Sequence, residues 1–322
     1  MDKKYAIDSK EMITLGGVRQ SIRVRTSDPA LPVVLFLHGG PGVCDRHWVL
    51  KYQSALAKTA TMVCWDQRGS GLSYNKAYKP EDLTVDVMVS DAAELVEALL
   101  HRFDKEKVII VGHSWGSLLG TLLAHRHPEG IAAYIGMGQY VRGDENEALS
   151  YDFVMNKARE SGNQKAIAQL ERIGSPVNGH YKSLDDLMVQ RNWMTKFGGG
   201  SYAEKESIWS SMIIPLLKTD EYRLGDLWSY YKGTFFSLEA LWSEVVDCNL
   251  EDEVKSLKMP VFLTEGRHDQ NTPIPIAERW FNALKAPRKE WIWFENSAHS
   301  PIKEQPKKWG DAVEDIIKSL DN

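Results

Sequence analysis

Residues 107–127 read KVIIVGHSWGSLLGTLLAHRH and carry the strongest signal of fold class in this chain. An apolar run at 107–111 predicts a buried strand, and residues 116–127 predict a helix. Between them lies GHSWG, a GxSxG pattern at the turn from strand to helix. A serine at such a turn is lifted above the edge of an α/β sheet, and the flanking glycines leave room for the sharp bend. The segment therefore predicts an α/β fold that presents Ser114 as a nucleophile.

The alternation of strand and helix continues on both sides of this segment. Its predicted strands lie at 32–37, 61–65 and 131–137, and its predicted helices at 45–58 and 84–103. Continuous apolar runs are typical of strands covered on both faces. Strand–helix alternation favours right-handed crossovers and a mostly parallel, doubly wound sheet. Before it, two runs with Gly16-Gly17 between them predict an antiparallel hairpin.

The pattern stops between residues 141 and 247, which are polar and lack the signature of a buried strand. It resumes with the strand VFLTE at 261–265. We interpret the chain as one α/β core, residues 1–140 and 248–322, interrupted by a helical cap at 141–247. The interruption carries tryptophans that either line a substrate pocket or only pack the cap; these are Trp193, Trp209, Trp228 and Trp242.

Composition excludes several classes of function. Of the 322 residues, 43% are hydrophobic and 26% are charged, as in ordinary globular proteins. Lys and Arg number 39 against 44 Asp and Glu, a net charge of −5 that gives no general attraction for nucleic acid or anionic lipid. No apolar run approaches the roughly 20 residues of a membrane span. Three scattered cysteines indicate no metal site and suit a reducing compartment, so we expect a cytoplasmic protein.

A serine nucleophile needs a base that is oriented by an acid. His299 lies in NSAHSP, directly after the predicted strand EWIWFE, and Asp269 lies in GRHDQNTP, after VFLTE. Both therefore stand at the carboxyl ends of strands, where sites of open α/β sheets are built. Glu265 is the rival acid, but it ends its strand and is expected to be structural. The other histidines near the motifs are expected to be structural or solvated: His38, His113, His125, His127 and His268.

Acyl transfer also needs donors aimed at the oxyanion. One expected donor is the backbone N–H of Trp115, the residue after the nucleophile. The other comes from HGGPG at 38–42, where three glycines let the main chain approach a substrate, and Gly40 is the candidate. A nucleotide-binding glycine loop is the alternative, but its spacing matches neither GxGxxG nor GxxxxGK[ST].

Five segments resemble the proline iminopeptidase family of α/β-hydrolases: HGGPG at 38–42, WDQRGSGLS at 65–73, GHSWGS at 112–117, GRHDQNTP at 266–273 and SAHSP at 297–301. The resemblance implies hydrolysis through an acyl-enzyme without a cofactor. It also implies that Ser114 is the nucleophile, Asp269 the acid and His299 the base. Family members remove N-terminal proline from peptides, or act on other aminoacyl amides, esters or lactones.

Two enzymatic hypotheses follow, both with a small-molecule or short-peptide substrate. The first is an aminopeptidase of the proline iminopeptidase type, and the second is a carboxylesterase or lactonase of the same fold. A non-enzymatic ligand-binding relative is the third alternative, and the complete set of Ser, Asp and His argues against it. The family's substrate amine is held by acidic residues. The sequence singles out none of the acids in the cap for that role: Glu145, Glu147, Glu204, Glu206 and Glu244.

Overall fold

The computed structural model of the protein describes residues 5–202, 216–217 and 219–320. Its strands form one sheet in the order β1-β2-β4-β3-β5-β6-β7-β8. β1 pairs antiparallel with β2, and β2 with β4, while the other neighbours are parallel. The strands are β1 Ile7–Leu15, β2 Val18–Thr26, β3 Val33–Leu37, β4 Thr61–Asp66, β5 Val108–His113, β6 Ile131–Met137, β7 Val261–Gly266 and β8 Lys289–Phe294. The predicted hairpin and the predicted mostly parallel sheet are both confirmed.

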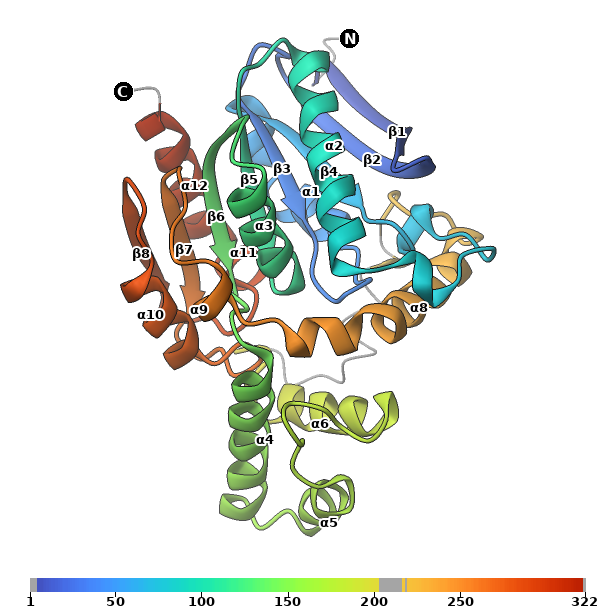
Figure 1. The fold of residues 1–322 in the computed structure, drawn as a ribbon, viewed down its shortest axis with the longest axis vertical. Coiled ribbons are helices and arrows are strands. Elements are labelled where there is room, and N and C mark those ends of the chain that lie inside the picture. Colours follow the sequence, from blue (N-terminus) through green and yellow to red (C-terminus); the bar gives the residue numbers. More distant parts are fainter. Residues whose placement is uncertain (1–4, 203–215, 218, 321–322) are drawn as a thin grey trace.

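Helices cover both faces of this sheet (Figure 1). The α-helices are α1 Arg46–Tyr52, α2 Val85–Phe103, α3 Trp115–Arg126, α4 Gly143–Glu160, α5 Gln164–Ile173, α6 Leu184–Lys196, α8 Asp226–Asp247, α9 Leu250–Glu253, α10 Ile274–Ala283, α11 Pro301–Glu304 and α12 Pro306–Leu320. Three short 3-10 helices are η1 Ser54–Lys58, η2 Gly71–Ser73 and η3 Pro80–Asp82. No helix in these described ranges has the length and apolar character that a membrane span requires.

The central strands β3 to β7 are buried on both sides because their side chains alternate between two cores. Along β3, Val33 and Leu35 belong to the core under α2, α3 and α10, whereas Val34 and Phe36 belong to the core under α1 and α12. This explains why the strand sequences are continuously apolar. The fold is the predicted doubly wound α/β arrangement.

The helix predicted over residues 45–58 is interrupted. α1 ends at Tyr52, and the 3-10 helix η1 follows it. Gln53 lies between them with φ −117° and ψ 25°, outside helical geometry. Its buried side-chain amide donates to the carbonyl oxygens of Ile302 and Pro306, at 3.3 and 3.0 Å. A tertiary contact therefore overrides the local helical pattern.

The helices between β6 and β7 pack in two different ways. α4, α5 and α6 share a separate hydrophobic cluster that includes Trp193, and Figure 1 shows them projecting beyond the sheet. α8 instead packs on the α/β core through Leu241 and Val245. Of the other tryptophans, Trp228 is exposed, and Trp209 lies outside the described residues. The predicted cap boundaries at 141 and 247 stay a prediction.

Candidate active site

Ser114 stands at the sharp turn between β5 and α3. Its backbone has φ 56° and ψ −121°, a strained conformation of the kind that recurs at functional sites. The Ser114 N–H donates to the Met137 carbonyl on β6, at 2.9 Å. A Cβ on Gly112 would lie 2.3 Å from the carbonyl oxygen of Gly116, and one on Gly116 would lie 2.0 Å from that of Leu37. Both glycines of the GxSxG pattern are therefore required by the packing around the turn.

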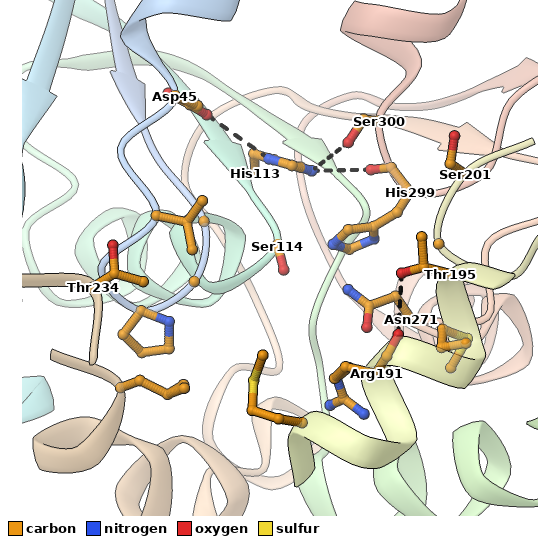
Figure 2. Close-up of a pocket in the computed structure, with 18 of the residues that line it drawn as sticks. Asp45, His113, Ser114, Arg191, Thr195, Ser201, Thr234, Asn271, His299 and Ser300 are labelled. Carbon is orange, nitrogen blue, oxygen red and sulfur yellow. Dashed lines mark hydrogen bonds and ion pairs between the residues drawn. The ribbon is translucent and has the colours of Figure 1, made fainter. Parts of the chain in front are cut away.

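His299 and Asp269 lie together at the carboxyl end of the sheet. His299 Nδ1 is 2.8 Å from Asp269 Oδ2. The buried Asp269 also accepts the N–H groups of Asn271 and Thr272 at 2.8 and 3.0 Å, and the Thr272 hydroxyl at 2.7 Å. A carboxylate on Nδ1 holds the tautomer in which Nε2 is free to accept a proton. Figure 2 shows the imidazole of His299 next to the Ser114 hydroxyl group.

Glu265, the rival acid, is placed elsewhere. Its side chain is fully buried and accepts the backbone N–H of Gln139 at 3.1 Å, whereas Asp269 contacts the imidazole. Burial, with the negative charge of Asp269 adding to it, holds the pKa of the Glu265 carboxyl well above its usual range. A group in this state suits a structural role.

This raised pKa makes the free energy of unfolding depend on pH. Folded Glu265 keeps its proton at pH values where the unfolded chain has lost it, so its contribution to stability is full below the ordinary pKa of 4.5 and declines as pH rises above it. We expect the Glu265→Gln variant, which cannot ionise, to gain stability relative to the wild type from pH 4.5 to pH 8. Thermal unfolding of both proteins across this range measures the difference. A difference that is constant with pH would contradict the assignment.

The two predicted oxyanion donors border a small cavity of about 40 Å³ beside Ser114. Gly40 has a φ of 118°, which glycine adopts at little cost. Trp115 is the first residue of α3, so its N–H has no acceptor within the helix. In the part of the chain that the structure describes, neither backbone N–H donates to a protein acceptor. Both are therefore available to a substrate oxygen.

Gln67 connects the two sides of this candidate oxyanion site, and sequence reasoning assigned no role to this residue. It accepts the indole N–H of Trp115 at 2.8 Å and donates its side-chain amide to the His38 carbonyl at 3.1 Å. His38 Nε2 in turn accepts the Gln67 backbone N–H at 3.2 Å, and its Nδ1 lies 2.8 Å from the Gly39 carbonyl oxygen. Burial lowers the pKa of His38, which favours a neutral ring with its proton on Nδ1. These bonds hold the glycine-rich loop in place.

A cavity of about 240 Å³ opens in front of Ser114 and His299. The glycine-rich loop forms one wall, and α6 and α8 form the opposite wall with mostly apolar side chains, among them Leu187, Met188, Met194, Phe235, Leu238 and Trp242. A concave cavity with a mostly apolar wall and polar groups around the nucleophile is typical of sites for small molecules, and its small volume suits a compact substrate. Of the four tryptophans for which both pocket lining and simple packing were considered, Trp242 lines this cavity.

The acids considered as amine ligands are engaged elsewhere. Both oxygens of Glu145 accept hydrogen bonds from Arg279, at 3.0 and 2.6 Å. Glu244 accepts the first backbone N–H of α2 at 2.7 Å. Glu147 is fully buried, and none of these three lines the cavity. The other two, Glu204 and Glu206, lie outside the described residues.

His113, which sequence reasoning treated as structural, contacts the loop of the predicted base. Its Nε2 lies 3.0 Å from the His299 carbonyl oxygen, and the two imidazole rings are 4.9 Å apart between centroids. Its Nδ1 is 3.8 Å from a carboxylate oxygen of Asp45. The only feature of the sequence that pointed to His113 was its position inside the GxSxG pattern.

Among the residues that the structure describes, no group of His, Cys, Asp or Glu side chains could hold a metal ion.

Residues 32–306 match the family model described as the alpha/beta hydrolase fold. The chain belongs to the alpha/beta hydrolase family. This alpha/beta hydrolase is 31% identical over 312 residues to the probable aminopeptidase YbaC of Bacillus subtilis (strain 168), covering 97% of this chain and 96% of the relative. It is 24% identical over 303 residues to a proline iminopeptidase of Heyndrickxia coagulans, covering 89% and 91%. The predicted relation to proline iminopeptidases, and the prediction that the protein is a hydrolase, are confirmed.

Solved structures of other alpha/beta hydrolases share the fold. Proline iminopeptidase of Mycobacterium smegmatis has a TM-score of 0.64 at 17% identity, over 97% of this chain and 99% of that one. An esterase of Exiguobacterium antarcticum has a TM-score of 0.62 at 16% identity, over 96% and 100%. The fold therefore accommodates both of the activities considered above.

Proposed function

We propose that this protein is a serine hydrolase that works through an acyl-enzyme on Ser114, and that it is an aminopeptidase of the proline iminopeptidase type acting on short peptides or aminoacyl amides. The observation that carries the proposal is the hydrogen-bonded pair of His299 and Asp269, whose imidazole lies beside a serine on a strained turn. A structural serine would need neither the strain nor an oriented base.

In the proposed acylation step, the Ser114 oxygen attacks the substrate carbonyl while His299 Nε2 takes its proton. Asp269 stays ionised and stabilises the imidazolium through Nδ1. The negative charge that develops on the carbonyl oxygen is met by the backbone N–H groups of Gly40 and Trp115. Each such donor contributes about 3 kcal/mol of transition-state stabilisation.

His299 then returns the proton to the leaving group, which departs as an amine or an alcohol. In deacylation the same imidazole takes a proton from water, and the resulting hydroxide attacks the acyl carbonyl. Ser114 regains its proton as the acid product leaves. Besides the substrate and water, these steps need only side chains and backbone groups of the chain.

The proposal includes a cap role for the helices opposite Ser114. α6 and α8 contribute the apolar wall of the cavity, so they would exclude water and limit the substrate to a compact one.

We also propose a cytoplasmic location, which is supported by three unpaired cysteines.

A carboxylesterase or lactonase activity is the second candidate. The observation that favours it is the engagement of Glu145, Glu147 and Glu244 in internal contacts, because an aminopeptidase needs an acceptor for the substrate amine. An ester or lactone makes no such demand.

Hydrolysis of two substrate sets tests these candidates. Proline and alanine p-nitroanilides report aminopeptidase activity, and short p-nitrophenyl esters report esterase activity. We expect turnover of the anilides. Activity on esters alone would replace the aminopeptidase proposal with the esterase one, and inactivity on both sets would overturn the proposal of a serine hydrolase.

A further inference from the structure

Arg191 on α6 faces the nucleophile across the cavity. It lines both the main cavity and the small cavity that also contains Ser114, Gly40 and Trp115. Its side chain is only 13% exposed. Figure 2 shows it below His299, with Asn271 between the two. A mostly buried cation therefore stands close to the reacting centre.

Glu147 on α4 is the counter-ion of this cation. Arg191 Nη2 donates to Glu147 Oε1 at 2.6 Å, and Asn146 donates to the same oxygen at 3.1 Å. Burial opposes the charged form of Arg191, but the carboxylate outweighs it and raises the pKa of the guanidinium. The Glu147 side chain has no exposed surface and lines neither cavity. The pair therefore turns its positive partner, and not its negative one, toward a substrate.

The guanidinium of Arg191 has N–H donors that no described residue uses. Of its five N–H groups, one is used by Glu147 and another by Gln190. Within the described ranges, no protein acceptor takes the others. Trp242 adds a buried indole N–H without an acceptor, and its ring centroid is 5.6 Å from the guanidinium carbon. The side-chain amide of Asn271 is likewise not bonded to any described residue. This end of the cavity therefore offers several N–H donors that no described residue accepts from.

Two other interpretations fit less well. An ammonium group would need a carboxylate, but Glu147 stands behind Arg191, and no acid of α4 or α8 lines either cavity. The carboxylates that do line the cavity, Asp45 and Glu304, stand near His113 and the loop that follows β8. A purely structural ion pair between α4 and α6 would leave the spare donors of Arg191 without a purpose.

We propose that Arg191, Trp242 and Asn271 form a carboxylate-binding subsite, so that the preferred substrate carries a carboxylate a few bonds from the carbonyl that Ser114 attacks. This inference rests on the proposed function and names its substrate class. In a free dipeptide the carboxylate belongs to the leaving amino acid. In a half-ester of a dicarboxylic acid it belongs to the acyl group. A charged hydrogen-bonded contact of this kind is worth roughly tenfold to a hundredfold in kcat/KM.

Matched substrate pairs test the subsite. One pair is Pro-Ala and its amide, and the other is mono-p-nitrophenyl adipate and p-nitrophenyl hexanoate. The readout is the ratio of kcat/KM within each pair, which cancels general effects of a substitution on catalysis. We expect the wild type to favour the carboxylate member of at least one pair by tenfold or more, and the pair concerned shows on which side of the scissile bond the carboxylate lies.

Three variants assign the effect to Arg191. Arg191→Met removes the charge and should bring the ratio to about one, whereas Lys196→Met, which removes an exposed charge from the same helix, should preserve it. Glu147→Gln frees the guanidinium and should preserve or raise the ratio. If Arg191→Met does not fold, Arg191→Lys replaces it, because a point charge without the planar fork should lower the ratio.

The results of these assays distinguish failure of the carboxylate subsite from failure of the proposed serine hydrolase function. A wild type that reacts with a fluorophosphonate and hydrolyses the neutral ester, but shows no carboxylate preference, would overturn the subsite and leave the proposed function intact. A preference that survives Arg191→Met, or that falls equally in Arg191→Met and Glu147→Gln, would also overturn it. A wild type that is inactive toward both would instead contradict the proposed function.

Discussion

Ser114→Ala should lose activity by about a thousandfold to a millionfold in kcat/KM, since the members of a catalytic triad act as a unit and only binding and the oxyanion donors remain. The protein should stay folded, because the Ser114 hydroxyl donates to no described protein group and alanine adopts the same backbone geometry at a similar cost. Initial rates on the best anilide or ester, with thermal unfolding of the same samples, measure both effects.

Ser161→Ala is a suitable control for this variant. Ser161 lies at the exposed end of α4, and its hydroxyl donates to the Lys157 carbonyl at 2.7 Å. Its loss should leave the rate within about twofold. Activity in Ser114→Ala within tenfold of the wild type would mean that another group is the nucleophile.

His299→Ala should lower kcat/KM by about as much as Ser114→Ala. Asp269→Asn should lower kcat by about ten thousandfold. In the asparagine variant a carboxylate that accepts from Asn271, Thr272 and His299 becomes an amide with its own N–H groups, so the tautomer that the mechanism needs is lost. Steady-state rates and the rate of fluorophosphonate labelling report the loss separately from substrate binding.

Matched controls exist for both substitutions. Glu265→Gln changes a buried carboxyl four residues from Asp269, and His125→Ala removes an exposed imidazole from α3. Both controls should remain active within a few-fold. If Glu265→Gln lost as much activity as Asp269→Asn, the assignment of the acid would have to be reversed.

The sequence predicted the sheet well because its central strands, β3 to β7, are buried on both faces. That burial makes runs such as Val33–Leu37 continuously apolar, and it makes their alternation with helices easy to recognise. The exceptions arose from tertiary contacts. Gln53 interrupts the helix predicted at 45–58 because its side chain bonds to Ile302 in α11 and to Pro306 at the start of α12, which no local pattern reports.

In the candidate site, the residues that could be predicted from the sequence are those that directly follow a predicted strand. Ser114, Asp269 and His299 each follow a strand, and parallel strands end at one edge, so the sequence placed them together. Their roles stay predictions that the variants above test. Gln67 and Arg191 could not be predicted, since each acts through a partner distant in the chain. Glu145 and Glu147 illustrate the same limit, because their pairing with Arg279 and Arg191 is visible only in three dimensions.

Identification of the residue that a fluorophosphonate labels shows whether the Ser114 hydroxyl is the one group that forms a covalent acyl-enzyme. Wild-type protein is treated with a fluorophosphonate, digested and analysed by tandem mass spectrometry. We predict a single adduct on Ser114, formed much more slowly in His299→Ala and absent in Ser114→Ala. An adduct on another residue, or equal labelling of the wild type and Ser114→Ala, would contradict the mechanism.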